Sequence, residues 1–309
     1  MPGVRRGPRF DPRPTRRFPA VIYFFQTLVG GLGMGAVYAL VAMGFSIVYR
    51  TMGLVNFAHA DVVMIGAFLA ATFFVTMHLP FVVALVGAIV LTGVIGLAIE
   101  RILRPLESKD LNLMLIGTIG FGIMLQSAAI LVWGSFGIAV PTPIPNLPLD
   151  LGGVIVTTYQ LLVLAVSAVA MLLLYLFLDR TKLGTAMQAA AMDRSAATAV
   201  GVNVATSNAI AFVIGSAIAA LAGALVGPLL YVNPSLGVYV GIKGFAAAIL
   251  GGFGSIPGAI VGGLIFGLIE AFASGPLSAY SELLTFVVFA LAMMVRQTGI
   301  FGERTVDRA

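Results

Sequence analysis

Charged side chains are scarce in this chain of 309 residues: Asp, Glu, Lys and Arg make up 9% of it, against about 25% in soluble domains. Cysteine is absent, which excludes disulfides, thiolate metal sites and a cysteine nucleophile. The two histidines are too few for a Cys/His metal cluster. Hydrophobic residues instead make up 60%, and the mean hydropathy is +1.08.

The scarcity of charge leaves six long runs without Asp, Glu, Lys or Arg, at residues 18–49, 62–99, 111–149, 151–178, 195–242 and 244–269. Each run meets or exceeds the roughly 20 residues that a helix needs to cross a bilayer core. No soluble core in a chain of this length hides so much uncharged sequence. We therefore predict an all-α, polytopic transmembrane helix bundle of about eight spans, one of them broken by glycines into half-helices.

Motifs for covalent chemistry are missing. The chain has no P-loop, no H-E-x-x-H motif and no G-x-S-x-G in a strand-to-helix setting. We predict that it is not an enzyme and has no catalytic residue, no metal site and no cofactor. The net charge of +5 does not indicate nucleic-acid binding, because the arginines gather at segment ends, where they mark membrane topology.

Helices are predicted at residues 21–49, 56–77, 81–99, 111–133, 159–178, 207–230, 241–273 and 282–295. A proline-punctuated loop follows residue 140, and an alanine-rich polar interruption covers residues 181–206. The positive-inside rule places the loops 101–109 and 180–194, and the tail after Arg296, in the cytoplasm. The proline loop then lies outside.

The chain is predicted to have one membrane domain with a tail at each end. Residues 1–19 carry six arginines and five prolines and are predicted to be a basic, disordered tail. Residues 20–300 form the transmembrane domain, and 301–309 a cytoplasmic tail. Three predicted spans separate the basic tail from the loop 101–109, which puts the tail outside, against its charge. Either a glycine-broken first helix does not cross simply, or the tail is misplaced or not made.

The segment 241–273 is too long for one helix, since it would extend about 50 Å across a core of about 30 Å. Its middle reads Gly-Gly-Phe-Gly-Ser-Ile-Pro-Gly at residues 251–258, which predicts a break. Unwound backbone at membrane depth is tolerated where protein buries it or a water-filled cavity faces it. Gly251, Gly252, Gly254 and Ser255 are therefore candidates for a translocation path. The alternative is a tight turn at the outer surface.

Ionisable groups within apolar runs are further candidates, because each costs about 2.5–3.5 kcal/mol at membrane depth. Asn56, His59 and Asp61 either line a path or mark a helix start with Asn56 as the N-cap. Glu270 is either buried or at the cytoplasmic interface. Lys243 is predicted to extend to the outer interface.

Small residues recur at four-residue spacing, which predicts close helix packing in lipid. They form the stripes Gly215/Ala219/Gly223/Gly227, Gly258/Gly262 and Gly263/Gly267.

Four segments then resemble a known family. They are residues 38–45 (YALVAMGF), 53–61 (GLVNFAHAD), 244–259 (GFAAAILGGFGSIPGA) and 298–302 (TGIFG). These resemble the permease subunits of branched-chain amino acid ABC importers, in particular the H-type subunit of the Liv system. The similarity covers nearly everything from residue 20 to 303, whereas the arginine-rich front lacks a counterpart.

The resemblance implies a permease domain in a bacterial plasma (inner) membrane. It implies a second homologous permease subunit, two cytoplasmic ABC ATPase subunits and an extracytoplasmic solute-binding protein. The implied solutes are leucine, isoleucine, valine or related small amino acids, although members of the family also carry urea and short amides.

The resemblance also gives residues 181–206 a role as the segment that docks in a groove on the ATPase. Candidate coupling residues are Ala189, Ala190, Ala191, Asp193, Arg194 and Gly201. The family usually has an acidic residue where Met192 stands, so the contact differs in detail. An interfacial helix lying on lipid is the alternative for this segment.

Two other transport classes stay open from the residues alone. An ion-coupled secondary transporter would use Asp61 and Glu270 as titrating sites and the glycine break as a midplane site. A passive channel or structural subunit would need neither an ion gradient nor ATP.

Overall fold

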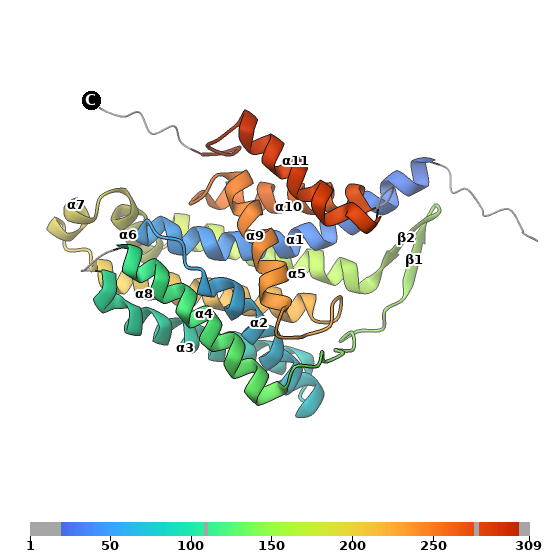
Figure 1. The fold of residues 1–309 in the computed structure, drawn as a ribbon, viewed down its shortest axis with the longest axis horizontal. Helices are drawn as coiled ribbons and strands as arrows, with labels where there is room; N and C mark the ends of the chain where they lie inside the picture. Colours follow the sequence, from blue (N-terminus) through green and yellow to red (C-terminus); the bar gives the residue numbers. More distant parts are fainter. Residues whose placement is uncertain (1–19, 108–110, 275–277, 303–309) are drawn as a thin grey trace, which may run out of the picture.

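The computed structural model describes residues 20–107, 111–274 and 278–302, most of them helical (Figure 1). The α-helices are α1 (Ala20–Met52), α2 (Ala58–Ala71), α3 (Phe81–Glu107), α4 (Leu111–Trp133), α5 (Thr158–Arg180), α6 (Lys182–Met192), α7 (Arg194–Ala199), α8 (Val204–Val226), α9 (Leu236–Gly251), α10 (Ile256–Ser274) and α11 (Ser281–Val295). A π-helical turn, η1 (Thr72–Thr76), extends α2, and a 3-10 turn, η2 (Ser278–Tyr280), precedes α11. The predicted all-α bundle is confirmed.

Seven helices of the described chain are long and apolar enough to cross a membrane: α1, α2 with η1, α3, α4, α5, α8 and α10. The helices α9 and α11 are apolar but shorter, at 16 and 15 residues. Many apolar side chains of α3, α4 and α5 point outward, including Val82, Ile116 and Leu173. An outward apolar surface of this kind is compatible with contact to the hydrocarbon core of a bilayer. How many of the nine helices cross stays a prediction.

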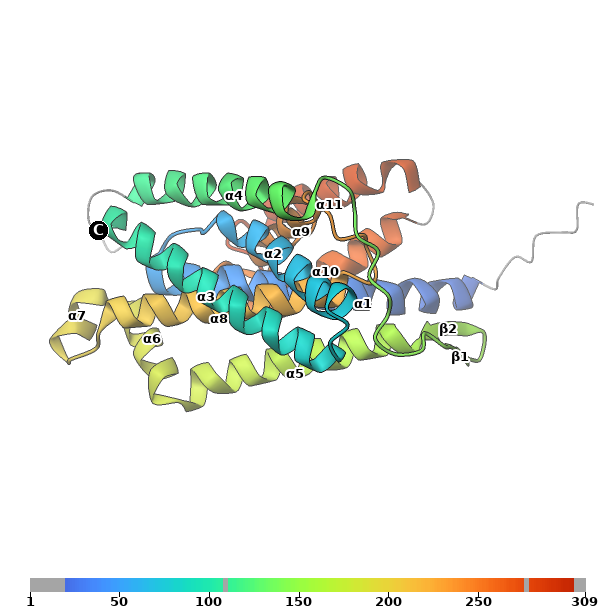
Figure 2. The ribbon, with the colours of Figure 1, turned by 90° about the horizontal axis from the view of Figure 1, so that it is seen from below.

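The bundle has two chemically different ends. Apart from the buried Lys243, the basic residues of the described chain lie where helices end or turn at one end, which we call the basic end; they are Arg50, Arg101, Arg104, Arg180, Lys182, Arg194 and Arg296. The short helices α6 and α7 extend from this end (Figure 2). Positive charge concentrates on the cytoplasmic side of membrane proteins, so the basic end is predicted to face the cytoplasm, and this stays a prediction.

The opposite end, which we call the hairpin end, carries a β-hairpin of β1 (Pro148–Leu151) and β2 (Val154–Thr157) (Figures 1 and 2). The sequence prediction had only a loop here. Gly152 and Gly153, with φ of 71° and 97°, make the two-residue turn, because such a turn needs positive φ at both positions.

Helix α1 settles one alternative from the sequence. It runs unbroken through its five glycines, so the broken first helix is wrong. Its start lies at the hairpin end, where the Gln26 amide exchanges hydrogen bonds of 2.6 and 2.7 Å with the backbone of Ile155. The basic tail of residues 1–19 lies outside the described residues, as does 303–309 of the C-terminal tail.

The segment 241–273 is divided as the glycines predicted, but with different bounds. Helix α9 starts five residues earlier than expected and ends at Gly251, and α10 begins at Ile256. The intervening turn lies at the basic end, where Phe253 packs on Tyr49 near the end of α1, with ring centroids 4.6 Å apart. The structure therefore has a turn between two helices at one end of the bundle, and the positive-inside rule predicts that this end is cytoplasmic and not outer.

Glycine contacts hold the centre of the bundle together. A Cβ atom on Gly263 or Gly267 of α10 would collide with the backbone of Ala39 or Gly35 on α1. The stripe on α8 acts in the same way, since a Cβ on Gly223 would strike the α2 backbone. Backbones approach this closely because lipid offers no hydrophobic drive for helix association, so packing of small residues must supply it.

We predict that Gly263→Ala lowers stability by about 1–3 kcal/mol, the usual cost of overpacking, because the new methyl group meets α1 backbone that has no room to move. The matched control is Gly120→Ala on α4, where a Cβ meets no atom within 4 Å. Unfolding of the purified protein in increasing SDS measures both variants. Equal midpoints for the two would contradict the packing argument.

Candidate functional site

The polar segment predicted at residues 56–61 lies where α2 begins inside the bundle. Residues 53–57 are not helical, and Leu54 and Asn56 are buried. The Asn56 side-chain oxygen accepts a hydrogen bond of 3.1 Å from the amide of Ala58. The N-cap position itself is Phe57 and has no side-chain cap, so the predicted N-cap at Asn56 is one residue early. Asn56 instead pairs the first amide of a helix that starts in a protein-lined interior, where an unpaired amide would be costly.

His59 and Asp61 face different neighbours. The His59 ring is 1% exposed and packs on Phe45 at 4.6 Å between centroids, in space that Gly44 leaves free on α1. The Asp61 carboxylate points to α4, where a Cβ on Gly122 would overlap it. It also lies in the first turn of α2, where the helix dipole favours negative charge. The two groups thus do not converge on one ligand position.

The glycine turn is closed by the C-terminal segment. The amides of Ile300 and Phe301 donate hydrogen bonds of 2.9 and 2.8 Å to the carbonyls of Leu250 and Gly251. Gly252 has φ of 105°, and a Cβ there would meet the backbone of residues 301 and 302. Ser255 accepts a hydrogen bond of 3.1 Å from Gly258 and caps α10. The turn is thus a packed joint, and the carbonyls of Leu250, Gly251 and Gly252 are paired with protein amides.

Aromatic rings connect this turn to the start of α2. Phe253 in the turn contacts Phe245 on α9, with centroids 5.5 Å apart, and Phe245 contacts both Phe45 and Phe57 at 5.5 and 5.8 Å. Phe45 in turn carries His59. The structure therefore brings the segment 56–61 and the turn 251–255 into one region, as candidates for a shared path should be.

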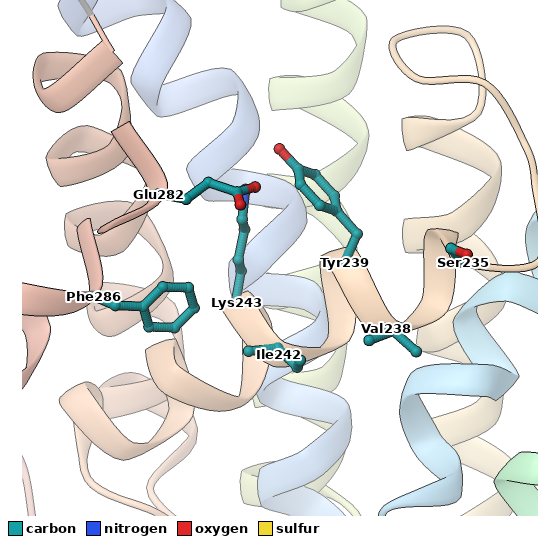
Figure 3. Close-up of a pocket in the computed structure, with 7 residues that line it drawn as sticks. All are labelled: Ser235, Val238, Tyr239, Ile242, Lys243, Glu282 and Phe286. Carbon is teal, nitrogen blue, oxygen red and sulfur yellow. The ribbon is translucent and has the colours of Figure 1, made fainter. Parts of the chain in front are cut away.

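Glu270 belongs to a separate cluster. Its carboxylate accepts a hydrogen bond of 2.6 Å from the Tyr38 hydroxyl and forms an ion pair with Lys243. Lys243 also lies 3.6 Å from the centre of the Tyr239 ring and 3.8 Å from Glu282. Figure 3 shows Lys243, Tyr239 and Glu282 directed toward one another. The cluster joins α1, α9, α10 and α11.

Lys243 corrects a sequence prediction, since its side chain is 3% exposed and does not extend to the outer interface. A signal was present in the sequence: Lys243 and Glu270 are the two charged residues between Arg194 and Glu282. Charges inside membrane segments pair with one another, so an isolated Lys and an isolated Glu on adjacent helices predict an ion pair.

Helices α6 and α7 form the predicted coupling segment, which extends past the ends of α5 and α8 (Figures 1 and 2). Thr181, Asp193 and Asn203 cap α6, α7 and α8 respectively. Hydrogen bonds from the Ser195 hydroxyl and from the amides of Ala196 and Ser195 hold the pKa of Asp193 below its usual value. Three caps in one segment explain how a polar stretch keeps a fixed shape.

The candidate coupling residues divide between the inside and the outside of this segment. Ala190 is 1% exposed, so it packs within the chain and is not available to a partner. Ala189 and Ala191 are half-buried, and Gly201 is exposed with φ of 89°. Within this segment, the most exposed large apolar side chains are those of Met192 and Val200, at 88% and 79%. Sequence reasoning missed Val200 as a candidate for docking.

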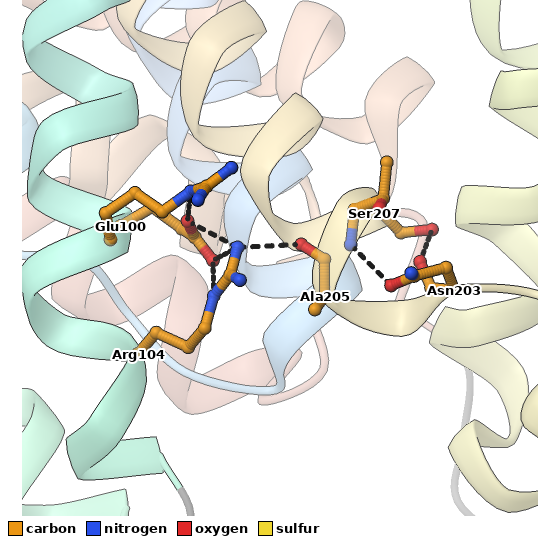
Figure 4. A network of polar contacts seen from close by, with 7 residues as sticks. Glu100, Arg104, Asn203, Ala205 and Ser207 are labelled. Carbon is orange, nitrogen blue, oxygen red and sulfur yellow. Dashed lines mark hydrogen bonds and ion pairs between the residues drawn. The ribbon is translucent and has the colours of Figure 1, made fainter.

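Two polar contacts tie the coupling segment to the bundle. Arg194 donates a hydrogen bond of 3.1 Å to the carbonyl of Thr51, near the end of α1. Arg104 pairs with the fully buried Glu100 through two hydrogen bonds of 2.9 Å and reaches the carbonyl of Ala205 on α8 at 3.4 Å (Figure 4). The second contact was not predicted. The first contact connects α7 to α1, and the second connects the start of α8 to α3.

Comparisons with known proteins agree with this architecture. Residues 27–295 match the family described as "Branched-chain amino acid transport system / permease component". The chain is 39% identical over 306 residues to the high-affinity branched-chain amino acid transport system permease protein BraD of Pseudomonas aeruginosa, covering 94% of this chain and 99% of BraD. It is 37% identical over 303 residues to the corresponding permease LivH of Escherichia coli strain K12, covering 93% and 98%.

Among solved structures, PsaBC from Streptococcus pneumoniae in complex with Fab is similar with a TM-score of 0.43 and 17% identity, covering 90% of this chain and 92% of that chain. The family match extends over most of the described helices, and the two permeases align over nearly their whole length. The chain therefore belongs to the family of branched-chain amino acid transport system permease components.

Proposed function

We propose that this chain is a membrane-spanning subunit of an ABC importer that moves branched-chain amino acids across the plasma membrane. The observation that carries the proposal is the 39% identity to a branched-chain amino acid permease over 94% of the chain. The seven long apolar helices support a multi-pass membrane location. The subunit itself catalyses no covalent step and offers a path whose access is switched by its partners.

The partners follow from the same membership. Two ATPase subunits would dock at the basic end, a second homologous permease would complete the path, and a solute-binding protein would deliver solute at the hairpin end. A partner shifts the balance between two access states by as much as its affinity differs between them. Docking of an ATPase on the exposed tip of α6 and α7, formed by Met192 and Val200, is one contact that could differ between the two states.

The path is proposed to pass the region where residues 56–61 and 251–255 meet. Non-helical backbone enters the bundle there at residues 53–57, and the glycine turn lies nearby. Nucleotide-driven movement of α7 would reach this region through Arg194 and the end of α1, because Tyr49 on that helix end packs on Phe253 in the turn.

The proposed function predicts that leucine uptake into proteoliposomes requires ATP, the partner ATPases and the loaded binding protein, and continues when an uncoupler removes ion gradients. The readout is radiolabelled leucine accumulated inside the vesicles. Uphill accumulation by this chain alone, driven by a proton or sodium gradient, would show a secondary transporter instead. Equal uptake with and without ATP would indicate a passive channel.

The docking role of α6 and α7 predicts that Val200→Asp or Met192→Lys lowers ATP-driven uptake about tenfold or more, since truncating a central interface side chain costs at least 1–2 kcal/mol. ATP hydrolysis by the complex should no longer respond to the loaded binding protein. Thr185→Lys, at an exposed position of α6, is the matched control. Unchanged uptake in both tip variants would contradict docking through this surface. Ala190 is unsuitable here, because changing it disturbs packing.

The closed glycine turn predicts that Gly252→Ala abolishes uptake without preventing insertion. Its methyl group would collide with the backbone of residues 301 and 302 and detach the C-terminal segment. The matched control is Gly254→Ala, which also has positive φ, at 86°, but meets only the Tyr49 ring at 3.3 Å. An alanine is strained at either position, so any difference between the two variants reports the collision with residues 301 and 302. We expect lower uptake and faster protease cleavage after Arg296 in the Gly252 variant than in the Gly254 variant. Equal uptake and equal cleavage in the two variants would attribute the defect to backbone strain and contradict the collision.

A further inference from the structure

A groove of about 350 Å³ lies between α9 and α11 at the Lys243 cluster, lined by Ser235, Val238, Tyr239, Ile242, Lys243, Glu282 and Phe286 (Figure 3). This volume lies within the range of small-ligand sites. Ser235 directly precedes α9 and Glu282 is in the first turn of α11, so the groove is near the hairpin end. Solute arriving from outside would meet it early.

The groove contains one positive and one negative side chain, and the two differ in how firmly the protein fixes them. Lys243 is buried and fixed from behind by Glu270, which Tyr38 holds in turn. Glu282 has a side chain that is 63% exposed and lies 3.8 Å from the Lys243 amino group, beyond hydrogen-bond distance. The fixed ammonium and the exposed carboxylate thus line the groove as neighbours, so that one ligand with both charge signs can contact both of them.

The remaining wall is apolar. Val238 and Ile242 come from successive turns of α9, and Phe286 faces them from α11 (Figure 3). A pocket of apolar side chains with a few placed charged groups is the usual design of a small-molecule site. A free aliphatic amino acid has the complementary chemistry, with a carboxylate, an ammonium group and a branched hydrocarbon side chain.

We propose that this groove binds the amino acid during entry, with Lys243 contacting its carboxylate, Glu282 its ammonium group, and Val238, Ile242 and Phe286 its side chain. The inference rests on the proposed function and adds a substrate-binding position that the sequence did not predict. It also explains why an expensive buried charge is kept in an apolar helix. A zwitterionic lipid headgroup shares the ammonium and anion chemistry, so the test must separate the two.

The test uses the full complex in nanodiscs of phosphatidylglycerol, which has no ammonium headgroup, without the binding protein. Equilibrium dialysis measures the binding of three ligands. They are leucine, 4-methylpentanoate, which lacks the ammonium group, and 3-methylbutylamine, which lacks the carboxylate. We expect Glu282→Gln to weaken the binding of leucine and of the amine about tenfold or more and to leave the affinity for 4-methylpentanoate unchanged. Lys243→Gln should show the reverse selectivity. Asp150→Asn, which removes an exposed carboxylate of the hairpin, is the matched control and should change nothing.

Leucine affinity unaffected by Glu282→Gln would overturn the proposal, as would an equal loss for all three ligands, which indicates structural damage. Glu282 is largely exposed, so its variant tests the site even if Lys243→Gln fails to fold. In parallel discs with phosphatidylethanolamine, lipid retention that depends on Glu282, without leucine binding, would assign the groove to a headgroup and overturn the proposal. ATP-driven leucine uptake by the unaltered complex reports separately on the proposed function.

Discussion

Close approach of helix backbones is the constraint on which the rest of this structure depends. Lipid solvates apolar side chains as well as a protein interior does, so a membrane bundle gains its cohesion from packing and from polar contacts. Here α10 lies on α1, and α8 on α2, at distances that leave no room for a Cβ at Gly263 or Gly223. These contacts fix a central group of helices. Helix α3 makes a similar contact with α8, since a Cβ on Gly96 would meet the backbone of Phe212, but it also turns apolar side chains outward, as α4 and α5 do.

Buried charges add a second kind of contact between the helices. Glu100 and Arg104 join α3 to the start of α8 at the basic end, and Lys243 and Glu270 join α9 to α10. A charge in a low-dielectric interior is costly unless it is paired and hydrogen-bonded, and each of these pairs has a further partner, Ala205 or Tyr38. The pairs therefore specify which helices stay together when others move. Neither pair contributes a residue to the region of segment 56–61 and turn 251–255, which is linked by aromatic and glycine contacts instead.

The sequence predicted what depends on local composition and missed what depends on contacts. The uncharged runs predicted the helical bundle, and the glycines of residues 251–258 predicted the division between α9 and α10. The helix start was predicted with Asn56 as its N-cap, one residue before the observed N-cap Phe57. The β-hairpin was missed because the prolines dominated the reading of that loop, although Gly152-Gly153 before β-branched residues favours a hairpin. Lys243 was placed at the interface because its partner lies 27 residues away on another helix. The family resemblance made Ala190 a docking candidate, but its burial is set by contacts within the folded chain.

Helix α9 gives the two candidate regions a physical connection. It carries Lys243 in its first half and ends in the glycine turn, so one helix of about 24 Å spans from the groove near the hairpin end to the joint near the basic end. A short helix moves as a rigid body, and proteins accommodate such movements at a few terminal residues. Displacement of the turn would thus shift Lys243 relative to Glu282 on α11 and change the spacing of the two charges. Binding of a zwitterion that fits one spacing would in return favour one position of the turn, because coupling between sites is reciprocal.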